Sequence, residues 1–106
     1  MGFNDIKKEA IKRLKAGAYT HEARGKIDVK NLFATGQISE EYVIELITKT
    51  SGDYYCCYKH YHDSDVMIHI LKPYKDQVRW YVKFYFYCHD IFFISVHHDE
   101  AYYENC

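Results

Sequence analysis

Residues 78–87 read VRWYVKFYFY, and this run decides the expected fold class. Core-forming residues occupy alternate positions: Val78, Trp80, Val82, Phe84 and Phe86. Because successive side chains of a strand point to opposite faces, the pattern predicts a strand with one face packed on a core. The opposite face then carries a ladder of cations and phenols: Arg79, Tyr81, Lys83, Tyr85 and Tyr87.

Three other runs in the second half of the chain are rich in aromatic and β-branched residues, as strands are. They span residues 54–61, 66–71 and 91–96. The breaks between the four runs are short and turn-like. Short breaks indicate antiparallel neighbours, because parallel strands need long crossover connections. Residues 54–98 are therefore expected to form a four-stranded antiparallel meander.

The first half of the chain, residues 4–50, has helical periodicity instead. Helices are expected over three segments: Asn4 to Gly17, Asp28 to Gly36 and Ser39 to Thr50. Each segment opens on a residue type that caps helix N-termini. Residues 18–27 are expected to be a loop. The predicted fold class is α+β, with the N-terminal helices packed on one face of the meander.

Length and composition fit one domain over residues 1–106, with a short tail at 99–106. The net charge is −1, although the first thirty residues hold eight Lys or Arg against four acidic residues, which leaves room for a basic face. No apolar run reaches the length of a membrane span, and the N-terminus lacks a secretion signal. We therefore expect a cytoplasmic protein without membrane contact.

Cysteine and histidine spacing does not indicate a metal site. The four cysteines, at positions 56, 57, 88 and 106, form no C-x-x-C pair. In a cytoplasmic protein, free thiols are favoured over disulfides. A group of potential ligands surrounds one predicted turn without a recognised spacing: His60, His62, Asp63, Asp65 and His69. Neither a metal nor another cofactor is expected.

The register of the strand at 66–71 would bring a histidine to the ladder face. If Ile70 pairs with Trp80 in the core, His69 lies opposite Tyr81 on the other face. A slip of one residue in this pairing would move His69 to the core side, because strand side chains alternate. We expect His69 beside Tyr81.

The strand at 91–96 would bring a second histidine to the same place. Pairing of Val82 with Val96 through a three-residue turn puts His97 opposite Tyr81 and Ser95 opposite Lys83. Two histidines and a tyrosine beside cations suit metal-independent RNA cleavage, which needs a base, an acid and positive charge at the phosphate. The same face could instead be a platform that stacks unpaired bases, or a solvated sheet face.

Several segments within about residues 10–98 resemble one family of toxins. They are IKRLKAG, GQISEEYVIELI, DYYCCYKHYHDSDVMIHILKP, and VRWYVKFYF followed by HDIFFISV. Together they are similar to the motility quorum-sensing regulator (MqsR) toxins. The third segment carries the residues that mark the family's fold: Asp53, Tyr54, Tyr55, Tyr61, Asp63, Lys72 and Pro73.

The resemblance implies a RelE-like fold, a metal-independent mRNA endonuclease, and a cognate antitoxin as partner. The family's functional tyrosine matches Tyr81. Its functional lysine falls on Cys56 and its functional glutamine on Ile68, so Lys59 and His69 are the nearest residues that could substitute. The late basic residue of the family falls near His97 or His98.

The sequence thus predicts a type II toxin, a hydrolase that cleaves mRNA either free or on the ribosome. The candidate catalytic residues are Tyr81, His69, His97 and Lys59. The candidate RNA-binding residues are Arg79, Lys83, Tyr85 and Lys72. Two alternatives stay open: a non-catalytic module of this fold that binds RNA or protein, and an immunity or antitoxin-like protein, which a near-zero charge and acidic turns would favour.

Overall fold

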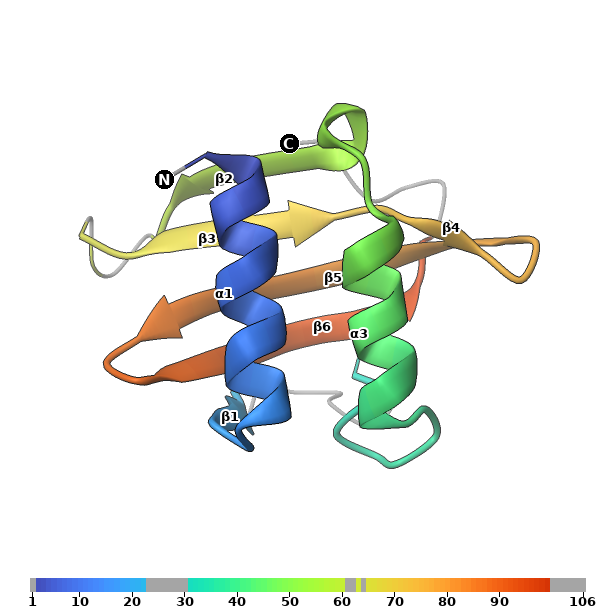
Figure 1. Cartoon of the computed structure of the whole chain (residues 1–106), viewed down its shortest axis with the longest axis horizontal. Coiled ribbons are helices and arrows are strands. Elements are labelled where there is room, and N and C mark those ends of the chain that lie inside the picture. The colour runs from blue at the N-terminus through green and yellow to red at the C-terminus, as the bar shows by residue number, and fades with distance from the viewer. Residues whose placement is uncertain (1, 23–30, 61–62, 64, 100–106) are drawn as a thin grey trace.

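Two helices cover one face of a six-stranded mixed sheet in the computed structural model of the chain, which describes residues 2–22, 31–60, 63 and 65–99 (Figure 1). The elements in chain order are α1 (Phe3–Lys15), β1 (Tyr19–His21), α3 (Glu40–Lys49), the 3₁₀ turn η1 (Gly52–Tyr54), β2 (Tyr55–Lys59), β3 (Met67–Leu71), β4 (Tyr74–Lys75), β5 (Val78–Tyr87) and β6 (Asp90–His98). Some predicted features lie outside the described residues: the second half of the loop at 18–27, the start of the helix from Asp28, Tyr61, His62 and the tail after Asp99.

The sheet topology corrects the predicted four-stranded antiparallel meander. Strand order is β1-β6-β5-β3-β2, and β4 pairs with β5. The pairs β2–β3, β3–β5 and β5–β6 are antiparallel, but β1 runs parallel to β6, with Tyr19 opposite Ile91. Strand β1 falls in the segment predicted as a loop, because three residues are too few to show a period of two. The sheet is therefore mixed and larger than predicted.

The ends of both helices follow local capping chemistry. Helix α3 begins as predicted, because Oγ of Ser39 accepts a hydrogen bond from N–H of Tyr42 at 3.1 Å. Helix α1 is capped by Gly2 rather than Asn4, and Gly17 follows its end with φ of 73°. The predicted short helix ending at Gly36 is wrong for residues 31–36, which form a bridge residue and turns.

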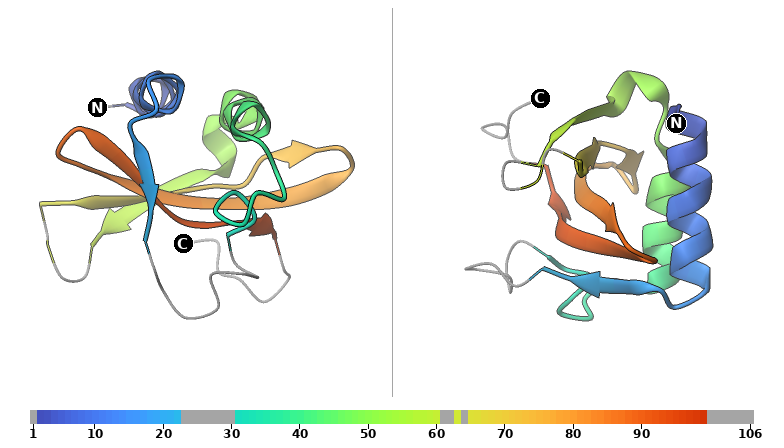
Figure 2. Two further views of the ribbon diagram at one scale, coloured as in Figure 1. Left: turned by 90° about the horizontal axis from the view of Figure 1, so that it is seen from below. Right: turned by 90° about the vertical axis from the view of Figure 1, so that its left-hand side faces the viewer.

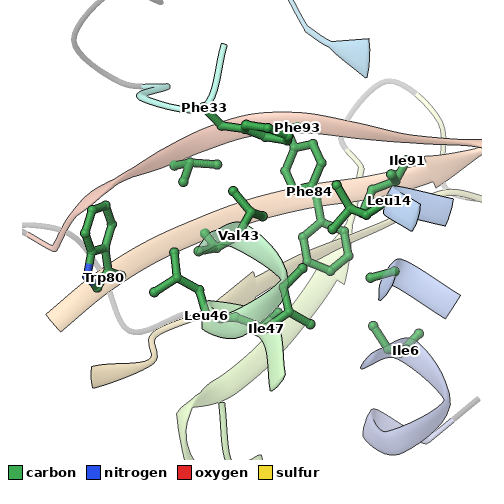
Figure 3. Close-up of a cluster of buried hydrophobic side chains, with 14 residues drawn as sticks. Ile6, Leu14, Phe33, Val43, Leu46, Ile47, Trp80, Phe84, Ile91 and Phe93 are labelled. Atoms are coloured by element: carbon green, nitrogen blue, oxygen red, sulfur yellow. The ribbon is translucent and has the colours of Figure 1, made fainter. Parts of the chain in front are cut away.

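Both helices lie on one side of the sheet, as Figure 2 shows in two further views, and the residues of the main core fill the space between helices and sheet. Trp80, Val82 and Phe84 are buried in this core, which confirms the face predicted from the alternation along β5. The helices contribute the following buried residues: Ile6, Ala10, Leu14, Val43, Leu46 and Ile47. Figure 3 shows Phe33, Phe93 and Phe84 as neighbours in this core, and the rings of Phe33 and Phe93 meet edge to face.

The opposite face of the sheet is less polar than the ladder on β5 indicates. Ile68 and Ile70 from β3 and Ile94 from β6 gather around Tyr81 in a second buried cluster. The exposed fraction of Tyr81 is only 7%. The prediction that Tyr81 faces solvent is therefore wrong, because its apolar neighbours come from strands whose register the ladder itself does not reveal.

One predicted register is confirmed near the ladder. Val82 pairs with Val96, Tyr81 with His97, and Lys83 with Ser95. The connecting turn has two residues rather than three, since Tyr87 pairs with Asp90. A β-bulge between Lys83 and Phe84 takes up the difference of one residue.

The other predicted register is wrong. Ile70 pairs with Lys83, not with Trp80, and His69 pairs with Phe84. The chain reverses in a tight turn at Asp76 and Gln77, whose φ angles of 54° and 64° suit the right-handed twist of a hairpin. The shift of three residues is odd, so it exchanges the two faces of β3 relative to β5.

The cysteines also differ from expectation. Cys57 and Cys88 are free, as predicted. Cys56, however, is disulfide-bonded, so the prediction of free thiols throughout is wrong. Alternation along β2 places Cys56 on the face of Ile70, its partner in β3, and Cys57 on the helix-covered face opposite His69.

Candidate functional site

The candidate site centres on a stacked pair of rings on the face opposite the helices. Tyr81 of β5 and His97 of β6 lie directly opposite each other in the antiparallel pair. Their ring centroids are 5.1 Å apart and the ring planes meet at 15°. Both side chains are buried, with 7% and 6% of their surface exposed. The hairpin therefore holds a phenol and an imidazole in fixed contact.

A backbone contact orients the imidazole of His97. Its Nδ1–H donates a hydrogen bond to the carbonyl of His98 at 2.6 Å. A neutral imidazole carries one N–H, so Nε2 is then the nitrogen that can accept a proton. This tautomer gives His97 the form of a general base.

A buried lysine adds positive charge beside the rings. The ammonium of Lys72, between β3 and β4, lies 5.5 Å from the centroid of the Tyr81 ring. It also lies 3.6 Å from the carboxylate of Asp99. The backbone N–H of Asp99 donates to the carbonyl of Arg79 at 2.8 Å. Phenol, imidazole and ammonium thus meet in one place, which we call the Tyr81 cluster (Tyr81, His97, Lys72 and Asp99).

The predicted RNA-binding residues Arg79 and Lys83 extend from this cluster along β5. The guanidinium of Arg79 lies 4.2 Å from the ring centroid of Tyr54 and 5.4 Å from that of Tyr74. The ammonium of Lys83 lies 5.6 Å from the ring centroid of Tyr58. Cations and aromatic rings therefore alternate over this face, as the sequence predicts.

Tyr85 lies further along the same face but has a structural role as well. Its hydroxyl donates to a carboxylate oxygen of Glu22 at 2.6 Å. Its ring stacks on Phe92 of β6, with centroids 5.2 Å apart. Tyr85 and Phe92, with His60 and Tyr87 among other residues, line an apolar cavity of about 250 Å³.

Two predicted catalytic residues lie on the wrong face. His69 packs against Phe84 and Phe86 on the side of the helices, and alternation along β2 places Lys59 on that side too. The cause is the register of β3, which the tight turn at 76–77 shifts by an odd number of residues. Neither residue joins the Tyr81 cluster.

His69 belongs instead to a cavity beside α1. Its Nδ1 is hydrogen-bonded to the hydroxyl of Tyr55 at 2.9 Å, and both residues line a cavity of about 330 Å³ with Cys57. Burial lowers the pKa of His69 to about 4 and raises the pKa of Tyr55. At neutral pH the imidazole is therefore uncharged.

Acidification should destabilise the protein through His69. The folded state holds its pKa at about 4, below the ordinary 6.5, so the unfolded chain binds the proton more readily. The free energy of unfolding is therefore unaffected by protonation of His69 above pH 6.5. It decreases as the pH falls towards 4, by about 3 kcal/mol at most. Urea unfolding between pH 7 and pH 4.5 should show this loss in the parent and a smaller one in His69→Gln. Parallel losses in both proteins would mean that His69 is not responsible.

Several residues at the site escaped the sequence analysis. Asp99 falls in the predicted tail, and Tyr54 is interpreted only as a mark of the fold. Their roles depend on contacts between separate strands, for which the sequence carries no local signal. Alternation also places Cys56 and Ile68 on the face of Tyr81, where both belong to the apolar cluster.

Comparison with known proteins adds no family to these observations. The sequence matches no protein family model and no curated protein. Neither described helix combines the length and apolar character that crossing a membrane requires. Among the described residues, no three His, Cys, Asp or Glu side chains are grouped so that they could hold a metal ion.

Proposed function

We propose that the protein is the toxin of a type II toxin–antitoxin system and cleaves mRNA without a metal. The observation that supports this proposal is the Tyr81 cluster, in which the phenol of Tyr81 stacks on the imidazole of His97 and has the ammonium of Lys72 over its ring. These three groups can supply a base, an acid and charge stabilisation, which are the needs of transesterification at an RNA phosphate.

In this mechanism His97 acts as the base. Its Nε2 takes the proton of a 2′-hydroxyl, and the 2′-oxygen attacks the adjacent phosphorus. The bond from phosphorus to the 5′-oxygen breaks, a 2′,3′-cyclic phosphate forms, and the Tyr81 hydroxyl gives its proton to the leaving oxygen. The ammonium of Lys72 offsets the charge that develops on the phosphate. Because Tyr81 and His97 are buried, this face must open before RNA reaches them.

The partners and the location follow from this proposed activity. The substrate is mRNA, free or on the ribosome, and Arg79 and Lys83 hold it beside the cluster. A cognate antitoxin would restrain the toxin in the cytoplasm, where mRNA is translated.

Inducible expression with transcript-end mapping tests the proposal. We expect growth arrest and new 5′ ends in mRNA for the parent protein. His97→Gln should abolish both, while His89→Gln, in the exposed turn between β5 and β6, should behave as the parent. RNA that stays intact with and without ribosomes, together with normal growth, would refute cleavage.

A second candidate function is RNA binding without cleavage. It is favoured by Cys56 and Ile68, which occupy the positions of the functional lysine and glutamine of the MqsR toxins that the sequence resembles, and which are packed in the apolar cluster. A protein of this kind would retard RNA in an electrophoretic shift and leave its length unchanged. That result separates the two candidates.

A further inference from the structure

A third cavity lies at the end of the sheet where α3, η1 and β4 meet. Its volume is about 360 Å³, within the range of small-ligand sites. The residues that line it are Lys49, Ser51, Tyr54, Pro73, Tyr74 and Arg79. Except for Arg79, the sequence analysis assigned none of them to RNA binding.

The charges and polar groups of this cavity suit an anion. Lys49 and Arg79 are cationic, Ser51 offers a hydroxyl, and no carboxylate is among the described lining residues. The guanidinium of Arg79 is held in place, because its Nη1 donates to the carbonyl of Lys72 at 2.7 Å. A guanidinium has five N–H donors, so this bond leaves capacity for a phosphate.

The aromatic rings around Arg79 point to a nucleotide rather than a simple anion. Tyr54 and Tyr74 flank the guanidinium, and 49% and 58% of their respective surfaces are exposed. Exposed rings beside a cation are the usual platform for unpaired bases, which stack on them while the cation binds the backbone. An acidic peptide would use the cations but has no need of two exposed ring faces.

We propose that this cavity, the Arg79 subsite, holds one nucleotide of single-stranded RNA, with its phosphate on Arg79 and Lys49 and flanking bases on Tyr54 and Tyr74. The inference rests on the proposed function, since it takes RNA as the substrate. It extends that function by naming where the RNA strand is bound.

The Arg79 subsite lies directly beside the Tyr81 cluster. Arg79 precedes Tyr81 by two positions on β5, so both are on one face, about 7 Å apart along the strand. Lys72 joins the two places, because its carbonyl binds Arg79 and its ammonium lies over the Tyr81 ring. A nucleotide in the subsite would position its neighbour at the cluster.

Fluorescence anisotropy with a labelled 2′-O-methyl decauridine tests the subsite. This probe lacks the free 2′-hydroxyl, so binding is measured without cleavage. We expect Tyr54→Leu and Tyr74→Leu each to weaken binding by about 5- to 150-fold, the range found for loss of a stacked base. Tyr87→Leu is the matched control, because Tyr87 is similarly exposed at the other end of β5 and should change affinity little.

The cations are tested by the salt dependence of the same binding. Each lost phosphate contact lowers the slope of log K against log salt by about 0.7 for a single strand. Lys49→Gln and Arg79→Ala should each show this decrease, whereas Arg79→Lys should keep the slope. Lys8→Gln, an exposed substitution on α1, is the control and should bind as the parent. Circular dichroism verifies that Arg79→Ala folds, and Lys49, being exposed, tests the site independently.

The outcomes separate this inference from the proposed function. Unchanged affinity and slope in the Tyr54, Tyr74 and Lys49 variants would overturn the subsite, even if the parent cleaves mRNA. Equal losses in the Tyr87 control would also overturn it, because RNA would then stack along the whole face. Binding that depends on the subsite in a protein that leaves mRNA intact would support the subsite and refute cleavage.

Discussion

Replacing Tyr81 by phenylalanine is expected to lower RNA cleavage by about 10²–10⁴-fold, the contribution of a positioned proton-transfer group. The ring stays in its place against His97 and among the isoleucines of the second cluster, so the fold should persist. Only the hydroxyl is lost, and with it the proposed donor to the leaving 5′-oxygen. Transcript-end mapping and a gel assay on purified protein measure the effect.

The control for this experiment is Tyr87→Phe, which removes a hydroxyl from an exposed tyrosine on the same strand. It should leave cleavage unchanged. Tyr81→Ala is a poor substitute, because emptying a buried site destabilises the protein and mixes two effects. If Tyr81→Phe arrests growth as fully as the parent, the hydroxyl has no chemical role and the Tyr81 cluster is a packing feature.

Replacing Phe93 by alanine should lower the free energy of unfolding by about 3–5 kcal/mol, the usual loss for a buried phenylalanine. Phe93 of β6 is fully buried, and its ring contacts residues of both neighbouring strands, β1 and β5. Its ring centroid lies 5.3 Å from that of Phe33 and 5.9 Å from that of Phe84 (Figure 3). It lies 6.4 Å from the ring centroid of Tyr19 in β1. Urea unfolding gives the change in stability.

Tyr87→Ala serves as the control, since an exposed substitution should change stability by no more than about 0.5 kcal/mol. Hydrogen exchange adds a local readout. In Phe93→Ala the amides of β1 should lose protection before those of β3, because the rings of Tyr19 and His21 in β1 both contact Phe93. A loss below about 1 kcal/mol would show that β1 and the core are held by other contacts.

The alternation along β5 was enough to predict which residues lie under the helices. Ten residues with a period of two leave no ambiguity about the faces of a strand, and Trp80, Val82 and Phe84 are buried accordingly. The pairing of Tyr81 with His97 was also predicted, although through a three-residue turn; the two-residue turn and the bulge after Lys83 together give the same pairing. This pair is the part of the candidate site that sequence reasoning found.

The position of His69 could not be predicted for a physical reason. The turn before β5 is made by Asp76 and Gln77 in left-handed conformations that Gly and Asn usually supply. Without Gly or Asn at these positions, residues 73–77 are interpreted as a longer turn. The resulting error of three residues in the register of β3 against β5 places His69 on the opposite face of the sheet. Pro73 adds to the difficulty, because its missing N–H separates β3 from β4.

Strand β1 shows a different limit of local reasoning. Its three residues pair with β6, which lies near the other end of the described chain. Nothing within residues 19–21 indicates such a partner, since parallel pairing depends on a strand that the local sequence does not contain. The number of strands in the sheet could therefore be determined only from the tertiary structure.

The parallel pairing of β1 with β6 has a consequence for synthesis on the ribosome. Tyr19 is made early and its partner Ile91 late, so the edge of the sheet stays open while most of the chain is translated. At about 5–20 residues per second, this interval is on the order of 10 s. Tyr81 and His97 are likewise made late and meet only when β6 has emerged. On the proposed function, a nascent chain therefore cannot cleave mRNA until β6 has left the ribosome.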